Sequence, residues 1–299
     1  MTDLTPSTPS AALRPRRSVL YMPGANERAL EKAAGLPADA LILDLEDAVA
    51  PDAKADARER VCEAATSDRY GAREVAIRVN SAGTAWHDDD LRAAAAAAPD
   101  AVVVPKVDSA ATVHAIEKAL EAGGAPERTA IWAMLETPVA MLRAEEICSA
   151  SPRLTVLVMG TNDLAKELQA EHVPGRRPLL TGLGLALIAA RATGRVILDG
   201  VYNDIKDAEG FEAECVQGRQ MGFDGKTLIH PSQLEPCNRV FAPAAADVER
   251  SQRIIEAFEQ AEADGRGVVT VDGRMIENLH VEQARRTLAL HEAITSRAG

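Results

Sequence analysis

Eight short apolar segments, separated by stretches with the pattern of amphipathic helices, constrain the fold more than any other feature. They are residues 18–22, 40–43, 75–79, 101–104, 131–135, 156–159, 196–198 and, more weakly, 225–229. Continuous apolar runs indicate strands that are buried on both faces, and helices between strands indicate parallel pairing. Eight such units predict a (β/α)8 TIM barrel. An open doubly wound sheet is the alternative, which is disfavoured because no GxGxxG motif follows the first segment.

The sequence suggests three parts. Residues 1–15 are rich in Thr, Ser and Pro and contain no apolar segment, so we expect a disordered tail rather than a secretory signal. Residues 16–243 contain the eight units and form the predicted catalytic domain. Residues 244–299 carry a charged helix at about 245–265 and a short strand or turn at 268–271, followed by another helix. We expect this C-terminal helical arm to pack on the barrel or on a neighbouring subunit.

Charge and cysteine content exclude several classes of protein. The net charge of −12 and the pI of about 5.1 do not favour binding to nucleic acid. No apolar stretch reaches the roughly 20 residues that span a bilayer, so we expect no membrane segment. Cys62, Cys148, Cys215 and Cys237 are widely spaced, without a CxxC pair, which is typical of reduced thiols in a cytoplasmic protein.

Two carboxylates follow directly after neighbouring apolar segments. Glu136 comes after the segment 131–135, and Asp163 comes shortly after 156–159. Because the carboxyl ends of parallel strands meet at one rim of a barrel, we expect these side chains to converge. Mg2+ is usually held by one or two carboxylates together with water and ligand oxygens. The sequence therefore predicts a divalent metal site, and with it an enzyme.

Further charged residues follow the other predicted strands. Asp44, Glu46 and Asp47 come after the second segment, Arg78 lies within the third, and Lys106 follows the fourth. Solvated loops are often acidic, so each of these acids alone has a simple explanation. Their joint position at one rim, among a few cations, favours a functional site.

Seven motifs run through the predicted barrel in order: RSVLYMPG at 17–24, LDLEDAV at 43–49, IRVN at 77–80, VPK at 104–106, LET at 135–137, GTNDL at 160–164 and GFDGKTLIHP at 222–231. Together they resemble the citrate lyase β-subunit-like branch of the HpcH/HpaI aldolase superfamily. The resemblance implies a TIM barrel that binds Mg2+ or Mn2+ through Glu136 and Asp163. It also implies that the substrate is a short β-hydroxyacyl-CoA thioester.

The resemblance also assigns roles to the charged residues of the rim. Arg78 would face the thioester carbonyl and stabilise the negative charge that develops there; alternatively it pairs with Glu46 or Asp47 to hold the rim together. Asp44, Glu46 and Asp47 would mainly orient Arg78 and the metal-bound waters from behind. Lys106 is either a cation near the thioester or a partner in a rim salt bridge.

Contacts to CoA are expected near the first strand. Family members place CoA in the region that corresponds to Arg17 and Tyr21, and its phosphates need local cations in so acidic a protein. The alternative is a basic tail without function. His230, at the close of the last segment, is expected to hydrogen-bond at the rim rather than to act in catalysis.

The C-terminal segment bears on which reaction occurs. Relatives that make or break a carbon–carbon bond usually carry an aspartate after a Met-Ile or similar pair, whereas here Glu277 follows Met275-Ile276. The longer side chain displaces the carboxylate, and proton transfer requires hydrogen-bond reach. We therefore expect hydrolysis, with Glu277 or Asp47 activating a water molecule.

The motifs GTNDLAKEL at 160–168, DGVYN at 199–203 and ENLH at 277–280 are together most similar to the branch that hydrolyses (3S)-malyl-CoA to malate and CoA. One alternative is a reversible lyase that cleaves malyl-CoA, β-methylmalyl-CoA or citramalyl-CoA to a short acyl-CoA and a 2-oxo acid. A minor alternative is a non-catalytic subunit that binds acyl-CoA. The family also implies a homo-oligomer, either a trimer or a hexamer.

Overall fold

The computed structural model describes residues 14–264 and 269–298 of the chain. The described residues divide into two compact units: residues 16–241, and the residues from 242 onward together with residues 14 and 15. The predicted boundary at residue 243 lies two residues beyond the structural one. Most of the predicted tail, residues 1–13, lies outside the described residues.

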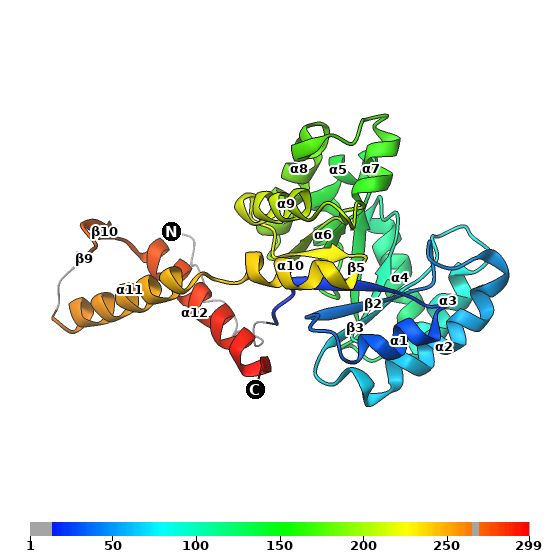
Figure 1. The fold of residues 1–299 in the computed structure, drawn as a ribbon. Helices are drawn as coiled ribbons and strands as arrows, with labels where there is room; N and C mark the ends of the chain where they lie inside the picture. The colour runs from blue at the N-terminus through cyan, green and yellow to red at the C-terminus, as the bar shows by residue number, and fades with distance from the viewer. Residues whose placement is uncertain (1–13, 265–268, 299) are drawn as a thin grey trace. The chain divides into compact units, whose positions relative to one another are not determined.

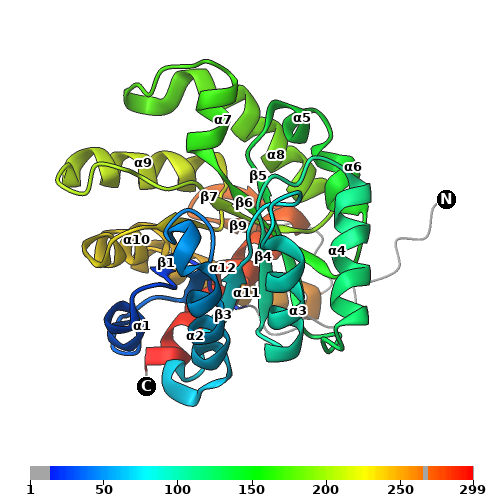
Figure 2. The ribbon, with the colours of Figure 1, turned by 90° about the vertical axis from the view of Figure 1, so that its right-hand side faces the viewer.

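The larger unit is a closed barrel of eight parallel strands, as predicted (Figures 1 and 2). Each strand pairs with its neighbours in chain order, and β1 pairs with β8 to close the barrel. Every predicted apolar segment overlaps the strand of the same order. The strands are β1 (Ser18–Pro23), β2 (Ala40–Asp44), β3 (Glu74–Arg78), β4 (Ala101–Val104), β5 (Ala130–Leu135), β6 (Leu154–Met159), β7 (Val196–Asp199) and β8 (Gly225–Leu228).

Helices connect the strands and surround the barrel (Figure 2). Several begin at a side chain that accepts a hydrogen bond from a free backbone N–H of the first turn, as Asn26, Ser109, Thr137 and Asp207 do. The α-helices are α1 (Glu27–Ala33), α2 (Lys54–Thr66), α3 (His87–Ala97), α4 (Ala110–Ala122), α5 (Pro138–Leu142), α6 (Ala144–Ser149), α7 (Thr161–Glu167), α8 (Leu180–Ala192), α9 (Ala208–Met221) and α10 (Leu234–Phe241). Short 3-10 helices are η1 (Pro51–Ala53), η2 (Asp68–Tyr70), η3 (Pro174–Leu179) and η4 (Pro231–Gln233).

The barrel has two apolar layers. Alternate strand residues, among them Ile42, Val103 and Trp132, form the inner cluster, and the intervening residues pack against the helices. At the amino end of the strands, the Arg16 guanidinium lies 5.7 Å from the ring centroid of Trp132 and is paired with Glu74. These contacts lie at the amino end of the strands, whereas the sites of such barrels lie at the carboxyl end.

The C-terminal unit consists of a long helix, α11 (Ala245–Ala263), a two-stranded antiparallel sheet and a final helix, α12 (Asn278–Ala298). Its strands are β9 (Val269–Val271) and β10 (Arg274–Ile276). The sequence analysis recognised β9 but not β10. Asp272 and Gly273 both have positive φ, and Asp-Gly is a strong signal for a tight hairpin turn, so the signal was present.

All four cysteines are free, as expected from their spacing. Among residues 14–264 and 269–298, no helix combines the length and the apolar character needed to cross a membrane.

Candidate active site

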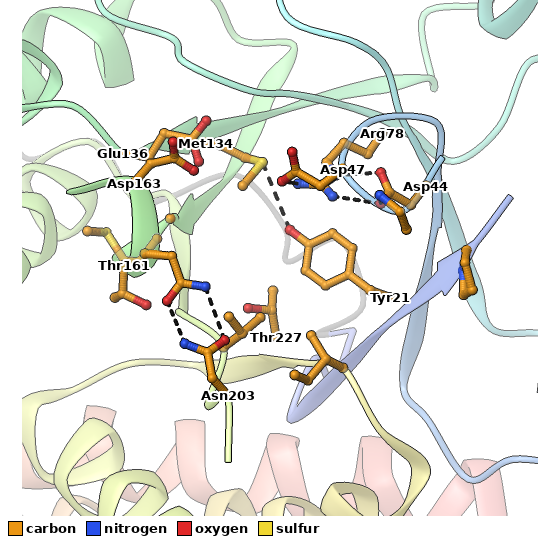
Figure 3. A pocket seen from close by; sticks show the side chains of 17 residues that line it. Tyr21, Asp44, Asp47, Arg78, Met134, Glu136, Thr161, Asp163, Asn203 and Thr227 are labelled. Carbon is orange, nitrogen blue, oxygen red and sulfur yellow. Dashed lines mark hydrogen bonds and ion pairs between the residues drawn. The ribbon is translucent and has the colours of Figure 1, made fainter. Parts of the chain in front are cut away.

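A cavity of about 390 Å³ opens at the carboxyl end of the barrel strands (Figure 3). The ends of β1, β2, β3, β5 and β6, together with the segments that follow β7 and β8, contribute to its lining. Six of the predicted site residues line it: Tyr21, Asp44, Asp47, Arg78, Glu136 and Asp163. Strand ends that are far apart in the sequence therefore meet here, as barrel geometry requires.

Arg78 is the last residue of β3, and carboxylates surround it. Its Nε and Nη2 donate hydrogen bonds to Asp44 at 2.6 and 2.7 Å. Its Nη1 lies 2.9 Å from Glu46 and 3.4 Å from Asp47. The guanidinium carbon stands 4.8 Å from the centroid of the Tyr21 ring, a cation–π contact. The arginine is thus fixed in position while one side of it faces the cavity.

Burial and charge act on Arg78 in opposite directions. The side chain is only 9% exposed, and burial alone would lower its pKa, but the charge of Asp44 raises that pKa well above the ordinary value. Burial also raises the pKa of Glu46, an effect that the charge of Arg78 opposes. Of the two roles expected for Arg78, the structure contains the rim ion pairs. Its contact with a thioester carbonyl stays a prediction.

Glu136 and Asp163 lie close together on another side of the cavity (Figure 3). Glu136 follows β5, is 2% exposed and accepts a hydrogen bond from the backbone N–H of Lys106 at 2.8 Å. A Cβ atom at Gly160 would lie only 2.1 Å from the Glu136 Oε2 atom, so only glycine leaves room for this carboxylate. Asp163 belongs to the first turn of α7, three residues after Gly160, which itself follows β6.

The chemistry of this pair fits a hard divalent cation. Burial, followed by the charges of Glu46 and Asp163, raises the pKa of Glu136 to about 8. A cation next to the two carboxylates would relieve that unfavourable charge. Within the described parts of the chain, no group of three or more His, Cys, Asp or Glu side chains could hold a metal. Water and ligand oxygens would complete the coordination, which is the arrangement that Mg2+ prefers.

Lys106 takes the rim position that the sequence analysis offered as one of two possibilities. Its side chain is half-exposed, with the ammonium nitrogen 3.8 Å from the Asp163 carboxylate, and its φ of 54° turns its backbone N–H toward Glu136. An exposed pair of this kind contributes little to stability. Its effect on the site is to place a cation beside Asp163.

The structure does not bring Arg17 to the cavity. Arg17 precedes β1, at the amino end of the barrel, and its side chain donates hydrogen bonds to both carboxylate oxygens of Asp39 at 2.8 and 2.9 Å. Tyr21, four residues further along the strand, does line the cavity. The structure thus does not place Arg17 in this cavity together with Tyr21, because the two residues lie toward opposite ends of one strand. The contact of Arg17 with CoA stays a prediction.

Glu277 belongs to the C-terminal unit and is not among the residues that line the cavity. Its backbone N–H donates to the Nδ1 atom of His280 at 3.0 Å. Its role in catalysis stays a prediction. His230 is exposed and accepts a hydrogen bond from the backbone N–H of Ser232, which caps η4 at the rim as expected.

The sequence analysis missed a pair of amides in the cavity wall. Asn162, at the start of α7, and Asn203, in the loop after β7, exchange two side-chain hydrogen bonds of 3.1 and 2.7 Å (Figure 3). Their only signal was proximity to Asp163 and to the end of a strand. Asp199, by contrast, ends a strand but is fully buried between Arg176 and Lys226 and does not line the cavity.

Comparison with known proteins places this site in a family. The profile described as HpcH/HpaI aldolase/citrate lyase matches residues 17–231, which is most of the barrel. The chain belongs to the HpcH/HpaI aldolase/citrate lyase family. The family predicted from the seven motifs is thus confirmed. A second profile, described as a C-C bond lyase of the TIM-barrel fold, matches residues 183–294.

Several known proteins resemble this chain over most of their length. A (3S)-malyl-CoA thioesterase of Cereibacter sphaeroides is 54% identical over 282 residues, covering 94% of this chain and 96% of the relative. The citrate lyase subunit beta of Escherichia coli is 37% identical over 284 residues, covering 93% and 94%. The CitE protein of Mycobacterium tuberculosis, in complex with magnesium, acetoacetate and coenzyme A, superposes with a TM-score of 0.75 and 29% identity, covering 92% and 97%.

Gly160→Ala should displace the Glu136 carboxylate, because the new methyl group would overlap it. We expect the affinity for Mg2+, measured by calorimetry, to fall at least about tenfold, the size of effect seen when supporting contacts of metal ligands are lost. Gly184→Ala in α8 is the matched control, since no atom lies within 4 Å of the position that its new methyl group would take. Unchanged Mg2+ affinity in Gly160→Ala would contradict this account of the site.

Glu136 should make the metal-free protein less stable as the pH rises. Its pKa of about 8 in the folded protein exceeds the ordinary 4.5, so between these values the folded state binds a proton that the unfolded state lacks. This group alone should lower the free energy of unfolding by up to about 1.4 kcal/mol per pH unit across that range. Urea denaturation in EDTA at pH 5.5, 6.5 and 7.5 should show a shallower decline for Glu136→Gln than for wild type. The exposed variant Glu121→Gln should behave as wild type does.

Proposed function

We propose that this protein hydrolyses (3S)-malyl-CoA to (S)-malate and CoA in a Mg2+-dependent reaction. The observation that carries the proposal is that Glu136 and Asp163 share one cavity with the fixed guanidinium of Arg78. A malyl thioester has an acid end that a metal could bind and a carbonyl that a cation could polarise. The 54% identity to a (3S)-malyl-CoA thioesterase supports this choice of substrate.

Glu136 and Asp163 would hold the Mg2+ or Mn2+ ion. When bound, the ion would polarise the substrate oxygens that contact it and favour the binding of an anionic acyl group in this acidic cavity. Gly160 gives the Glu136 carboxylate its space, and the Lys106 backbone orients it. The complex of a related CitE protein with magnesium, acetoacetate and coenzyme A supports both the metal and the CoA thioester.

Arg78 would stabilise negative charge on the thioester oxygen. Asp44 holds its Nε and Nη2 side, so the guanidinium keeps its orientation before the substrate arrives. Arg78 contacts three carboxylates, and the contact of its Nη1 atom with Asp47 is the longest, at 3.4 Å. The Asp47 side chain is 75% exposed. A carbonyl oxygen could therefore take the place of Asp47 with little disturbance of the other contacts.

Asp47 or Glu277 would take a proton from the attacking water. Asp47 lines the cavity, and release from Arg78 would leave its carboxylate free to accept that proton. Glu277 is the second candidate, from the position at which related lyases usually carry aspartate. Tyr21, in the wall of the cavity, would contact the bound acyl-CoA thioester.

A reversible lyase is the second candidate function. It is favoured by the 37% identity to a citrate lyase subunit beta and by the match to the C-C bond lyase profile. Malyl-CoA, β-methylmalyl-CoA or citramalyl-CoA would then be cleaved to a short acyl-CoA and a 2-oxo acid with the same metal ligands and Arg78. A non-catalytic acyl-CoA-binding subunit is disfavoured because the carboxylate pair and Arg78 are both present.

We further propose a cytoplasmic homo-oligomer, either a trimer or a hexamer. Four free cysteines suit a reducing compartment. The predicted C-terminal arm, residues 244–299, would pack on the barrel or on a neighbouring subunit. No nucleic acid or membrane partner is proposed.

The two candidate reactions yield different products. Purified protein with (3S)-malyl-CoA and Mg2+ should release free thiol without glyoxylate, and EDTA should abolish the release. Glyoxylate and acetyl-CoA with little free thiol would establish the lyase instead. If neither product forms, although Mg2+ binds, the non-catalytic alternative would stand.

The same assay can identify the base. We expect Asp47→Asn or Glu277→Gln to lower the rate of thiol release by about 100-fold or more, because a general base typically contributes 10²- to 10⁴-fold. The variant that removes the base should still bind Mg2+ with wild-type affinity, because neither Asp47 nor Glu277 is a predicted metal ligand. Full turnover in either variant would remove that residue from the role, and full turnover in both would refute the mechanism. The exposed variant Asp52→Asn is the control.

A further inference from the structure

We propose that Lys54 and Asn80 are positioning residues that hold the acidic loop after β2 against Arg78. The acidic loop is residues 45–48, which include Glu46 and Asp47. Neither Lys54 nor Asn80 lines the cavity. The inference deepens the proposed function and rests on it, because it concerns how the same cavity is kept in its working geometry.

Lys54, the first residue of α2, reaches back into the acidic loop. It is 6% exposed, and its ammonium group donates three short hydrogen bonds, to the backbone oxygens of Leu45 and Glu46 at 2.7 Å each and to the Asn80 Oδ1 atom at 2.6 Å. The ring of Trp86 covers the same ammonium group, with its centroid 5.2 Å away. An ammonium group has three N–H donors, so these bonds account for all of them.

Asn80 follows Arg78 by two residues and connects that strand to the loop. Its Nδ2 donates to the Leu45 oxygen at 3.0 Å and to Asp90 at 2.6 Å, while its Oδ1 accepts from Lys54. The Leu45 backbone N–H, in turn, donates to the Arg78 oxygen at 2.9 Å. The first residue of the acidic loop is thus bound on both sides to the segment that carries Arg78.

The helices behind the barrel support this connection. Asp90 of α3 is fully buried and accepts hydrogen bonds from the Asn80 backbone N–H at 3.0 Å and from the Arg58 Nε at 2.7 Å. Arg58 lies on α2, one turn after Lys54. The network therefore joins β2, β3, α2 and α3 at the point where the acidic loop begins.

The network also explains how three carboxylates can remain beside one arginine. Asp44, Glu46 and Asp47 all face Arg78, and mutual repulsion would tend to move the two loop carboxylates away. Lys54 adds a second buried cation on the far side of the loop and fixes its backbone. Because a displacement of about 1 Å can cost about 100-fold in rate, such support matters for catalysis.

Lys54→Met tests the proposal, with Arg73→Met as a matched control. Arg73 also donates to backbone oxygens, those of Ala33 and Leu36 at 2.7 and 2.8 Å, but at the amino end of β3, away from the cavity. Both variants should lose stability. Only Lys54→Met should lower kcat, by about 10- to 100-fold, while KM and the Kd for Mg2+ change by less than about twofold. A kcat equal to that of wild type would overturn the proposal, and so would an equal loss in Arg73→Met.

If Lys54→Met does not fold, Trp86→Leu decides. It removes the ring over the ammonium group without leaving a buried charge unpaired. It should lower kcat by about threefold or more, because without the cation–π contact the Lys54 ammonium group is held less firmly against the acidic loop. Wild-type kcat in Trp86→Leu would refute the positioning role.

A crystal structure of Lys54→Met, or of Trp86→Leu, separates this inference from the proposed function. Wild type inactive on (3S)-malyl-CoA would refute the function alone. The inference requires that the acidic loop move in the variant, so that the 2.9 Å contact between Arg78 and Glu46 is lost. An unchanged loop would overturn the inference, whatever the substrate.

Discussion

The site depends on a buried ion pair between adjacent strands. Asp44 and Arg78 are partners in the register of β2 and β3, and each is the last residue of its strand. The guanidinium therefore meets the carboxylate through two parallel hydrogen bonds without any help from a loop. A buried arginine without such a partner would be strongly unfavourable. The register of two strands thus sets the position from which Arg78 can face a ligand.

The metal-binding side of the cavity depends on backbone space rather than on ion pairs. Glu136 is buried next to other carboxylates, and its raised pKa reflects that cost. The fold keeps it in place because Gly160 has no side chain and because Lys106 adopts a left-handed conformation that aims an N–H at the carboxylate. Such local cost at functional positions is common when the binding of a cation or ligand offsets it.

An acidic protein can bind an anionic thioester when cations lie at the positions where charge is needed. Arg78 is buried among three carboxylates, Lys106 lies beside Asp163, and Lys54 stands behind the acidic loop. The net charge of −12 therefore says little about the cavity itself. Hydrolysis and carbon–carbon cleavage would use this arrangement in common, and they differ in which group moves the proton.

The sequence by itself determined the barrel, the order of its strands, the family and the convergence of Glu136, Asp163 and Arg78 at one rim. These follow from local patterns, since an apolar segment predicts a strand and a parallel barrel brings every strand end to one rim. Only the tertiary structure decided the contacts between side chains that no motif brings together. Arg17 lies at the amino end of the barrel, opposite the cavity. Asn162 pairs with Asn203, 41 residues later in the sequence, and Lys54 pairs with Asn80, 26 residues later. Such contacts depend on how helices pack behind the strands and on side-chain direction, which no local pattern encodes.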